Sequence, residues 1–541
     1  MTITAGGSPP SAGAAEAGAA GAGAGAGAVG PRLAVGADQV GVAVRLRPPR
    51  RSGLEERFAA TDPPRQLDVA RFPRVARVLR SRRFQFLLIL PNQIVFWAVI
   101  LLGLLGTVVP GLNFGTAITW YLWFCLVFVM MVVVGRAWCA MCPFGGFAEW
   151  VQRRAFWQRT QKALGLGRKV PEPIARYGFL LSVGTFLVLT WIEEFFNIAG
   201  PGAPHETSWM VVGIVVSALV FFLAFERRSF CRYVCPLSAL IGTVGAMGSV
   251  AGFRTRDREV CLACATKDCM RGGTDGYGCP WYTWPGSADS NLACGLCSEC
   301  YKACPSDNIG LYLQKPLTSV VAPHRRRIDV AWAVAILWGL VVFQQVNATN
   351  VYASVDGWLV GLTHIAYPNP IDYVGIIGAI ALAMAGIVWV VQRTLGRADL
   401  AVAASDGGFM ERTSRFRMFF MPLMYGIIPV VGADYFARQL PKFFKHVPRL
   451  VPAIGAWFGH GSTRSSIYQL HLLADPRIVT VQVGVIALGT AAAMVTSWRI
   501  AGRDLAAVST HPAAIRAVAV GLAAACGVAA IVLYIAMHAA S

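Results

Sequence analysis

Long apolar runs separated by short polar segments dominate the chain from about residue 86 onward. A helix needs roughly 20 mostly apolar residues to cross the hydrocarbon core of a bilayer, and nine runs come close to this length. The pattern therefore predicts an all-α polytopic membrane protein with about nine transmembrane helices. The predicted spans cover residues 86–108, 116–135, 177–196, 208–225, 329–346, 371–391, 417–436, 478–498 and 514–537.

Basic residues gather at alternate ends of these runs. Six arginines from Arg71 to Arg83 precede the first span, and seven Lys or Arg residues from Arg153 to Arg176 follow the second. The positive-inside rule places such segments in the cytoplasm. We therefore expect a cytoplasmic N-terminus, cytoplasmic segments after the second and fourth spans, and a location in the inner membrane of a bacterium.

Composition supports the membrane assignment and changes how the charge is interpreted. Charged residues make up 14% of the chain and hydrophobic residues 55%, whereas about 25% of the residues in soluble domains are charged. The formal net charge of +20 comes from residues at the ends of the spans. The lipid bilayer is therefore the expected partner, and nucleic acid is not.

The chain divides into four predicted parts. Residues 1–70 are rich in Ala and Gly and then polar, and we expect them to be disordered. Residues 71–236 form a four-helix membrane core, residues 237–328 a cysteine-rich segment, and residues 329–541 a C-terminal membrane region of about five helices. Within the third part, residues 239–253 are apolar but too short to cross, and they suit an amphipathic surface helix.

The strongest motif is a run of four cysteines that ends in proline. Cys294, Cys297, Cys300 and Cys304-Pro305 have the spacing C-x2-C-x2-C-x3-C-P, which is the bacterial ferredoxin run for [4Fe–4S] clusters. In this run three neighbouring cysteines hold one cluster, and the fourth binds the other cluster. The spacing therefore predicts a cytoplasmic segment like bacterial ferredoxin, with two [4Fe–4S] clusters.

A looser run supplies the partner cysteines that the second cluster needs. Its spacing is C-x2-C-x4-C-x9-C-P, from Cys261 to Cys279-Pro280. A zinc ribbon is the alternative, because paired C-x2-C motifs also suit tetrahedral Zn²⁺, but the Cys-Pro ends and the close run of four cysteines favour iron–sulfur clusters. The crossed ferredoxin pattern assigns a first cysteine set, Cys261, Cys264, Cys269 and Cys304, and a second cysteine set, Cys279, Cys294, Cys297 and Cys300.

Two further cysteine pairs follow the second and fourth spans. They are Cys139/Cys142 and Cys231/Cys235, here called the membrane cysteines, and each pair ends in Cys-Pro. Four soft thiolates at one membrane depth suit a third metal centre, either iron–sulfur or copper. The alternatives are a redox-active dithiol and structurally buried thiols.

These motifs together resemble the membrane polyferredoxin family with Cys-Pro motifs, over residues 84–325. The resemblance rests on the four spans, the Cys-Pro motif after the second and fourth, and the double ferredoxin segment. Family members carry paired C-x3-C-P motifs; Cys231 to Pro236 has this spacing, and Cys139 to Pro143 is one residue shorter. The family includes the quinol-oxidising membrane subunit of periplasmic nitrate reductase systems, a maturation flavoprotein of nitrous oxide reductase, and cytochrome-oxidase accessory proteins linked to cupric reduction.

The leading functional hypothesis is single-electron transfer between the quinone pool and a partner metalloprotein, as a component of a quinol-linked oxidoreductase. Metal handling is the first alternative, either by cupric reduction or by metalloenzyme maturation at the membrane cysteines. A redox-sensing membrane transporter or regulator is the second. Glu149 and Glu226 lie beside the cysteine motifs, and either could accept a quinol proton, although a purely interfacial position is the commoner role for such residues.

Overall fold

The computed structural model describes residues 66–109, 111–157, 164–199, 205–322, 326–365, 369–397 and 415–540. Residues 1–70 were expected to be disordered, and residues 1–65 of this part lie outside the described residues. Its last five residues, 66–70, differ from that expectation, because they contribute strand β1 (Leu67–Asp68) and begin the 3₁₀ helix η1 (Val69–Arg71).

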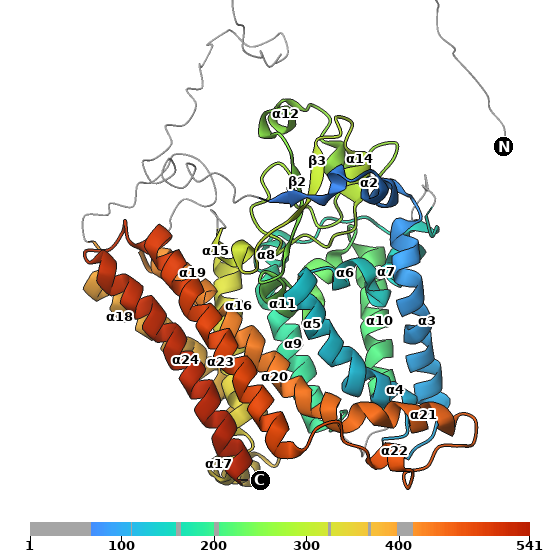
Figure 1. Cartoon of the computed structure of the whole chain (residues 1–541), viewed down its shortest axis with the longest axis vertical. Coiled ribbons are helices and arrows are strands. Elements are labelled where there is room, and N and C mark those ends of the chain that lie inside the picture. The colour runs from blue at the N-terminus through green and yellow to red at the C-terminus, as the bar shows by residue number, and fades with distance from the viewer. Residues whose placement is uncertain are drawn as a thin grey trace, which may run out of the picture. The chain divides into compact units, whose positions relative to one another are not determined.

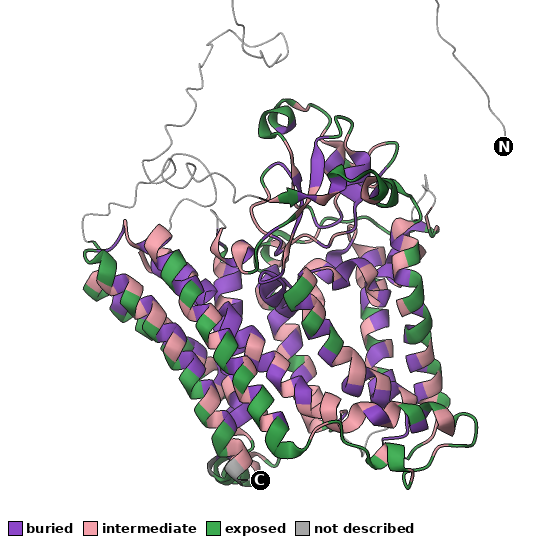
Figure 2. Cartoon of the chain, in the orientation of Figure 1, coloured by how far each residue is buried: buried purple, intermediate pink, exposed green. Residues whose placement is uncertain are grey.

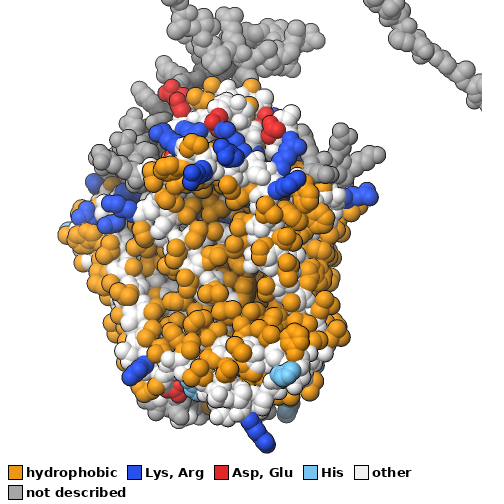
Figure 3. Space-filling model, turned by 45° about the vertical axis from the view of Figure 1, so that its right-hand side comes forward, with side chains coloured by type: hydrophobic (Ala, Val, Ile, Leu, Met, Phe, Trp, Pro, Cys, Tyr) orange, Lys and Arg blue, Asp and Glu red, His pale blue; other side chains and the backbone are white. Residues whose placement is uncertain are grey.

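Nine helical stretches in the described part of the chain are long and apolar enough to cross a membrane, which confirms the predicted fold class (Figure 1). Figure 3 shows a broad band of apolar side chains on the surface, with Lys and Arg gathered along one border. The spans are α3 (Phe84–Leu105), α4–η2–α5 (Phe114–Val134), α9 (Gly178–Phe195), α10 (Glu206–Ala224), α16 (Ile328–Val346), α18 (Pro370–Leu395), α19–α20 (from Arg415), α23 (Asp475–Ile500) and α24 (Pro512–Ala540).

The first four spans form a core that encloses two short helices. Helix α7 (Pro143–Arg153) packs on α3 and α10, and helix α11 (Pro236–Gly245) packs on α9 and α5. The surface helix expected over residues 239–253 is wrong, because α11 is buried along its length apart from Leu237 (Figure 2). Its two polar side chains, Ser238 and Thr243, donate to backbone carbonyls of the protein and so need no water.

The cysteine-rich segment stands on one end of this core and is closed by a small antiparallel sheet. The strand order is β1-β3-β2, with β2 at Val250–Thr255 and β3 at Ile309–Leu313. Strands β2 and β3 pair from Thr255 opposite Ile309, so the sheet joins the two ends of the segment. The short helices α12 (Arg258–Ala263), α13 (Asp268–Arg271) and α14 (Glu299–Ala303) carry cysteines between the strands, and α2 (Pro73–Arg80) and α15 (Thr318–Val321) flank it.

The C-terminal spans form a second bundle against the core. Helix α16 is its centre, with 14 of 19 residues buried. A single residue separates helix α19 (Arg415–Gly426) from α20 (Ile428–His446). Helix α20 packs on η2 (Ala117–Trp123) and α5 (Phe124–Val134) of the core. At the end away from the cysteine-rich segment lie α17 (Asn350–Thr363), α21 (Leu450–Ala456) and α22 (Ser466–Gln469) (Figure 1).

Candidate redox site

The two Cys-Pro motifs are built in the same way. Cys142 precedes α7 and Cys235 precedes α11, and each has an extended backbone, with ψ of 123° and 119°. Proline disfavours helical backbone in the residue before it, yet its own fixed φ suits the first position of a helix. Each Cys-Pro pair therefore ends one short helix, α6 (Trp138–Met141) or η3 (Phe230–Val234), and starts a buried helix, which points the chain back into the core.

All four membrane cysteines line one cavity inside the four-helix core. The cavity holds about 1020 Å³ of space that no protein atom fills, part of it open to the surroundings. Most of the lining is aromatic or aliphatic, including Trp120, Trp123 and Phe186, and Trp281 of the cysteine-rich segment closes the cysteine end. An apolar cavity of this size with a few polar groups is typical of a small-molecule site.

The membrane cysteines lie close enough together to act on one another electrostatically. Burial raises the pKa of the Cys231 thiol to about 12; Cys142 and Cys139 raise it as well, and Arg228 opposes them. Burial likewise raises the pKa of Cys142 to about 11 and that of Cys235 well above its ordinary value. Thiols in such surroundings stay neutral unless a positive group binds them, and a metal centre supplies such a charge.

An arginine three residues before each motif reaches across to the other motif. Arg228 precedes Cys231, and its Nη1 donates to the carbonyl of Cys139 at 3.0 Å. Arg136 precedes Cys139, and its Nη2 donates to the hydroxyl of Ser238, which in turn donates to the carbonyl of Cys231 at 2.6 Å. The first and second spans form one helical hairpin, and the third and fourth form another. Each hairpin therefore holds the cysteine backbone of the other hairpin in place.

A buried carboxylate fixes one of these arginines. Glu149 on α7 accepts from Arg228 at 2.7 and 2.9 Å and also from Arg153. Burial alone would raise the pKa of Glu149, but the charges of Arg153, Arg228 and Arg227 lower it to about 2. Glu149 is therefore an ion-pair anchor and does not suit the role of a quinol proton acceptor.

Glu226, the other acidic residue noted beside the motifs, lies in a shallower ion pair. Its carboxylate accepts from Arg232 at 2.8 Å, and both side chains are partly exposed. Neither it nor Glu149 lines the apolar cavity.

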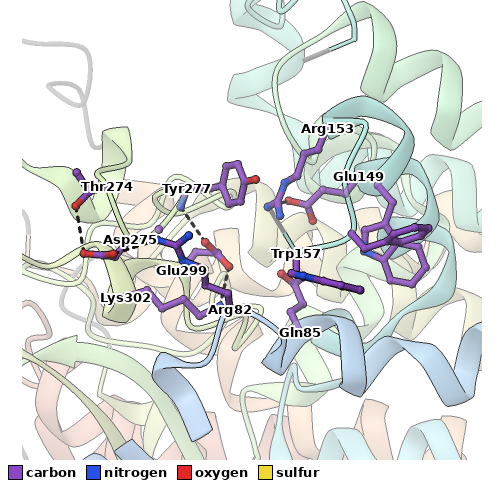
Figure 4. A pocket seen from close by; sticks show the side chains of 13 residues that line it. Arg82, Gln85, Glu149, Arg153, Trp157, Thr274, Asp275, Tyr277, Glu299 and Lys302 are labelled. Carbon is purple, nitrogen blue, oxygen red and sulfur yellow. Dashed lines mark hydrogen bonds and ion pairs between the residues drawn. The ribbon is translucent and has the colours of Figure 1, made fainter. Parts of the chain in front are cut away.

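The arginines that pair with Glu149 also join the core to the cysteine-rich segment (Figure 4). Arg153 lies over the ring of Tyr277 at 3.7 Å, and Arg227 donates to the carbonyl of Gly278 at 3.0 Å. Glu299 in turn accepts from the backbone amide of Tyr277 at 2.9 Å. The loop that contains Cys279 is thereby fixed to the membrane core.

The structure brings the first cysteine set together. Its four members line one small cavity beside Trp284 and Asn308. Burial raises the pKa of Cys269 to about 12, and the other members of the set, Cys304, Cys261 and Cys264, are its next strongest neighbours. Cys264 and Cys304 are partly exposed, whereas Cys261 and Cys269 are buried, which places this set at the outer side of the segment.

The second cysteine set lies nearer the membrane core. Burial raises the pKa of Cys300 well above its ordinary value, and its strongest charged neighbours are the other three members, Cys279, Cys297 and Cys294. Burial raises the pKa of both Cys297 and Cys231, and the charge of Arg228 opposes that shift at both thiols, so Arg228 lies between this set and the membrane cysteines. Trp281, next to Cys279-Pro280, is stacked on Arg136 at 4.3 Å and faces the apolar cavity.

The donor sets fit iron–sulfur clusters. All fourteen cysteines lie in the described part of the chain, and none forms a disulfide. Among the described residues, no three His, Cys, Asp or Glu side chains converge on a point where a single ion could sit. A [4Fe–4S] cluster takes its four thiolates on four different irons, so its ligands need not converge on one point. The assignment of individual ligands stays a prediction.

Three features of the site were not identified from the sequence. They are the apolar cavity, the crossed arginines and the position of Trp281. The arginines did leave a signal, because Arg136-x-x-Cys139 and Arg228-x-x-Cys231 repeat the same spacing. The cavity left none, because its lining comes from three spans, the two Cys-Pro regions and a distant loop.

Comparisons with known proteins agree with this organisation. The sequence profile of the family described as "4Fe-4S binding domain" matches residues 116–162 and 207–252, and each match contains one pair of membrane cysteines. The methylamine utilization ferredoxin-type protein MauN of Methylorubrum extorquens is 30% identical over 26% of this chain. The ferredoxin-type protein NapH of Escherichia coli is 29% identical over 24% of this chain.

The matches cover only part of each relative. The chain spans 48% of the length of MauN and 44% of that of NapH. An uncharacterized protein of Methanocaldococcus jannaschii is 24% identical over 34% of this chain, and 74% of its own length is covered. No solved structure matches the chain.

Proposed function

We propose that this chain, which the comparisons relate to the membrane polyferredoxins, passes electrons between the quinone pool and a partner metalloprotein. Its coarser role as a membrane iron–sulfur electron-transfer protein is supported by the 4Fe-4S profile and by the ferredoxin-type relatives. The quinone, the partner and the cytoplasmic location of the cysteine-rich segment belong to the proposal.

One observation carries the proposal. A single apolar cavity within the membrane core is lined by all four membrane cysteines and by Trp281. A quinol is an apolar, membrane-dissolved donor, so it can enter such a cavity without the cost of burying a charge. The cavity therefore offers a donor site beside cysteines that lie next to the second set.

The three cysteine groups are arranged in a series. The membrane cysteines line the cavity, the second set follows across Arg228 and Trp281, and the first set lies near the surface. Iron–sulfur clusters, when bound, accept and release single electrons over a wide range of potentials. The protein holds these positions by buried ion pairs such as Glu149 with Arg228, and it lines the cavity with aromatic side chains.

The test is reduction of the purified, anaerobic protein by duroquinol. Reduction is measured as the loss of the visible absorbance of the clusters. Wild-type protein should bleach with duroquinol as well as with dithionite. The Cys231→Ser/Cys235→Ser double variant should bleach with dithionite only, because a serine hydroxyl is a poor ligand for iron or copper. Equal bleaching of both proteins by duroquinol would contradict a role for the membrane cysteines.

Metal handling is the second candidate, because four soft thiols line one cavity and suit Cu(I). Under this alternative the same double variant should lose stoichiometric copper binding and cupric reduction. Under the electron-transfer proposal, added copper should change neither the rate nor the extent of bleaching by duroquinol.

A further inference from the structure

The apolar cavity has a charged side chain at each of two ends. At the cysteine end lies Arg228, which is held by Glu149. The other charged lining residue is Glu193, near the end of span α9. Glu193 is the only acidic residue among those that line the cavity.

The two ends lie on opposite sides of the membrane core. On α9, Ser182 donates to the carbonyl of Cys235 at 2.7 Å, so this turn of the helix lies at the cysteine end. Glu193 follows eleven residues later, about 16 Å further along the helix at 1.5 Å per residue. Between them Phe186, Leu189 and Thr190 line the cavity with Glu193, because positions three and four apart share one helix face.

Glu193 is held by a residue of the C-terminal bundle. Lys442 on α20 lies 3.4 Å from its carboxylate, and the ammonium lies over the ring of Trp120, another lining residue, at 4.9 Å. The side chain of Glu193 is 21% exposed and that of Lys442 is 36% exposed. The carboxylate therefore faces the cavity and also has access to the surroundings on the side away from the cysteine-rich segment.

From this arrangement we infer that Glu193 is the proton acceptor for quinol in the cavity, and that it releases the protons on the side opposite the iron–sulfur segment. The inference rests on the proposed quinol function. Each quinol O–H bond breaks in turn, and its proton forms an O–H bond to the Glu193 carboxylate before passing on to water. The two electrons leave one at a time for the iron–sulfur centres, and the product is the quinone.

Protons and electrons leave the quinol at opposite ends of the cavity because they move by different mechanisms. A proton moves only between atoms within hydrogen-bond reach, so it requires the carboxylate at its own end of the cavity. An electron crosses the apolar gap without such a chain of atoms. Lys442 is a positioning residue, because its ammonium lies 3.4 Å from the Glu193 carboxylate and so fixes where that carboxylate lies.

The first test compares three matched variants of the full-length protein. Glu193→Gln should slow duroquinol-driven bleaching of the clusters by about 100-fold, the lower end of the range for loss of a general base. Glu193→Asp should restore most of the rate. Glu194→Gln is the control, because Glu194 accepts from Asn347 at 3.1 Å and does not line the cavity; its rate should equal that of the wild type.

The second test locates the released protons directly, first in the wild-type protein and then in the Glu193→Gln variant. Wild-type protein is placed in vesicles with the cysteine-rich segment outward, as checked with added protease, and the pH dye pyranine is trapped inside. A pulse of duroquinol should acidify the interior within the same turnover that bleaches the clusters. Glu193→Gln vesicles should show little acidification.

The outcomes separate the two proposals. If duroquinol bleaches wild type and Glu193→Gln equally fast, or if protons appear only outside, the role of Glu193 is wrong and the quinol function stands. If dithionite bleaches the wild-type clusters and duroquinol does not, the proposed function fails and this inference fails with it.

Discussion

The ion pair between Glu149 and Arg228 leads to the sharpest stability prediction. The pKa of Glu149 falls from an ordinary value of 4.5 to about 2, a difference of about 2.5. At 1.36 kcal/mol for each pKa unit, the folded protein favours the charged carboxylate by about 3 kcal/mol. Removing one partner of a buried ion pair typically costs about 3–5 kcal/mol, because the other charge stays buried without compensation. Glu149→Gln should therefore destabilise the protein by about 3 kcal/mol.

The assay is unfolding in detergent, followed by tryptophan fluorescence, for the wild type and two variants. Glu226→Gln is the matched control, because its ion pair with Arg232 is partly exposed and such pairs contribute at most about 1 kcal/mol. The stability that Glu149 contributes is present above pH 4.5 and is lost as the pH falls through about 2. Wild type and Glu149→Gln should therefore converge below pH 4.5. Equal losses in both variants at pH 7 would refute the reasoning.

Two further predictions concern the clusters and the orientation. Iron and acid-labile sulfide should each reach about eight atoms per chain with two clusters, and about twelve if the membrane cysteines hold a third cluster. In the second case Cys139→Ser should lower both counts from about twelve to about eight. Stoichiometric zinc without visible absorbance would contradict the iron–sulfur assignment. Impermeant thiol reagents applied to cluster-free protein in right-side-out cells should leave Cys264 unlabelled, because the arginine-rich ends of the spans predict a cytoplasmic location for it. Labelling from outside would reverse the proposed orientation.

The nine spans could be predicted from the sequence because each needs only one property, a long apolar run. Helix α11 could not, because a short apolar run does not show whether it lies on the surface or inside, and here the core encloses it. The seventh span was predicted to end at residue 436, yet α20 continues to His446. Its last turns carry Arg438 and Lys442, whose charged groups reach the carbonyl of Gln344 and the carboxylate of Glu193.

The grouping of the cysteines was inferred from a different signal, and the assignment of ligands to clusters stays a prediction. The cysteine spacing encodes local loop geometry, and the structure places each predicted set in one neighbourhood. The proton acceptor was looked for beside the cysteine motifs, at Glu149 and Glu226, because proximity in sequence was the only guide. Glu193 lies 38 residues before its nearest motif cysteine, Cys231, and only the fold of α9 along the cavity shows its relation to the site.

The repeated hairpin explains why the site needs both halves of the core. One hairpin supplies only two thiolates, too few for an iron–sulfur cluster that is held by four. Arg136 and Arg228 each bind the opposite motif, directly or through Ser238, so neither pair of cysteines has its backbone fixed by its own hairpin alone. Both arginines also interact with the cysteine-rich segment. Arg136 stacks on Trp281, and the charge of Arg228 interacts with the Cys297 thiol. The side chains that assemble the membrane site therefore also set its position relative to the next cysteine set, as a chain of electron carriers requires.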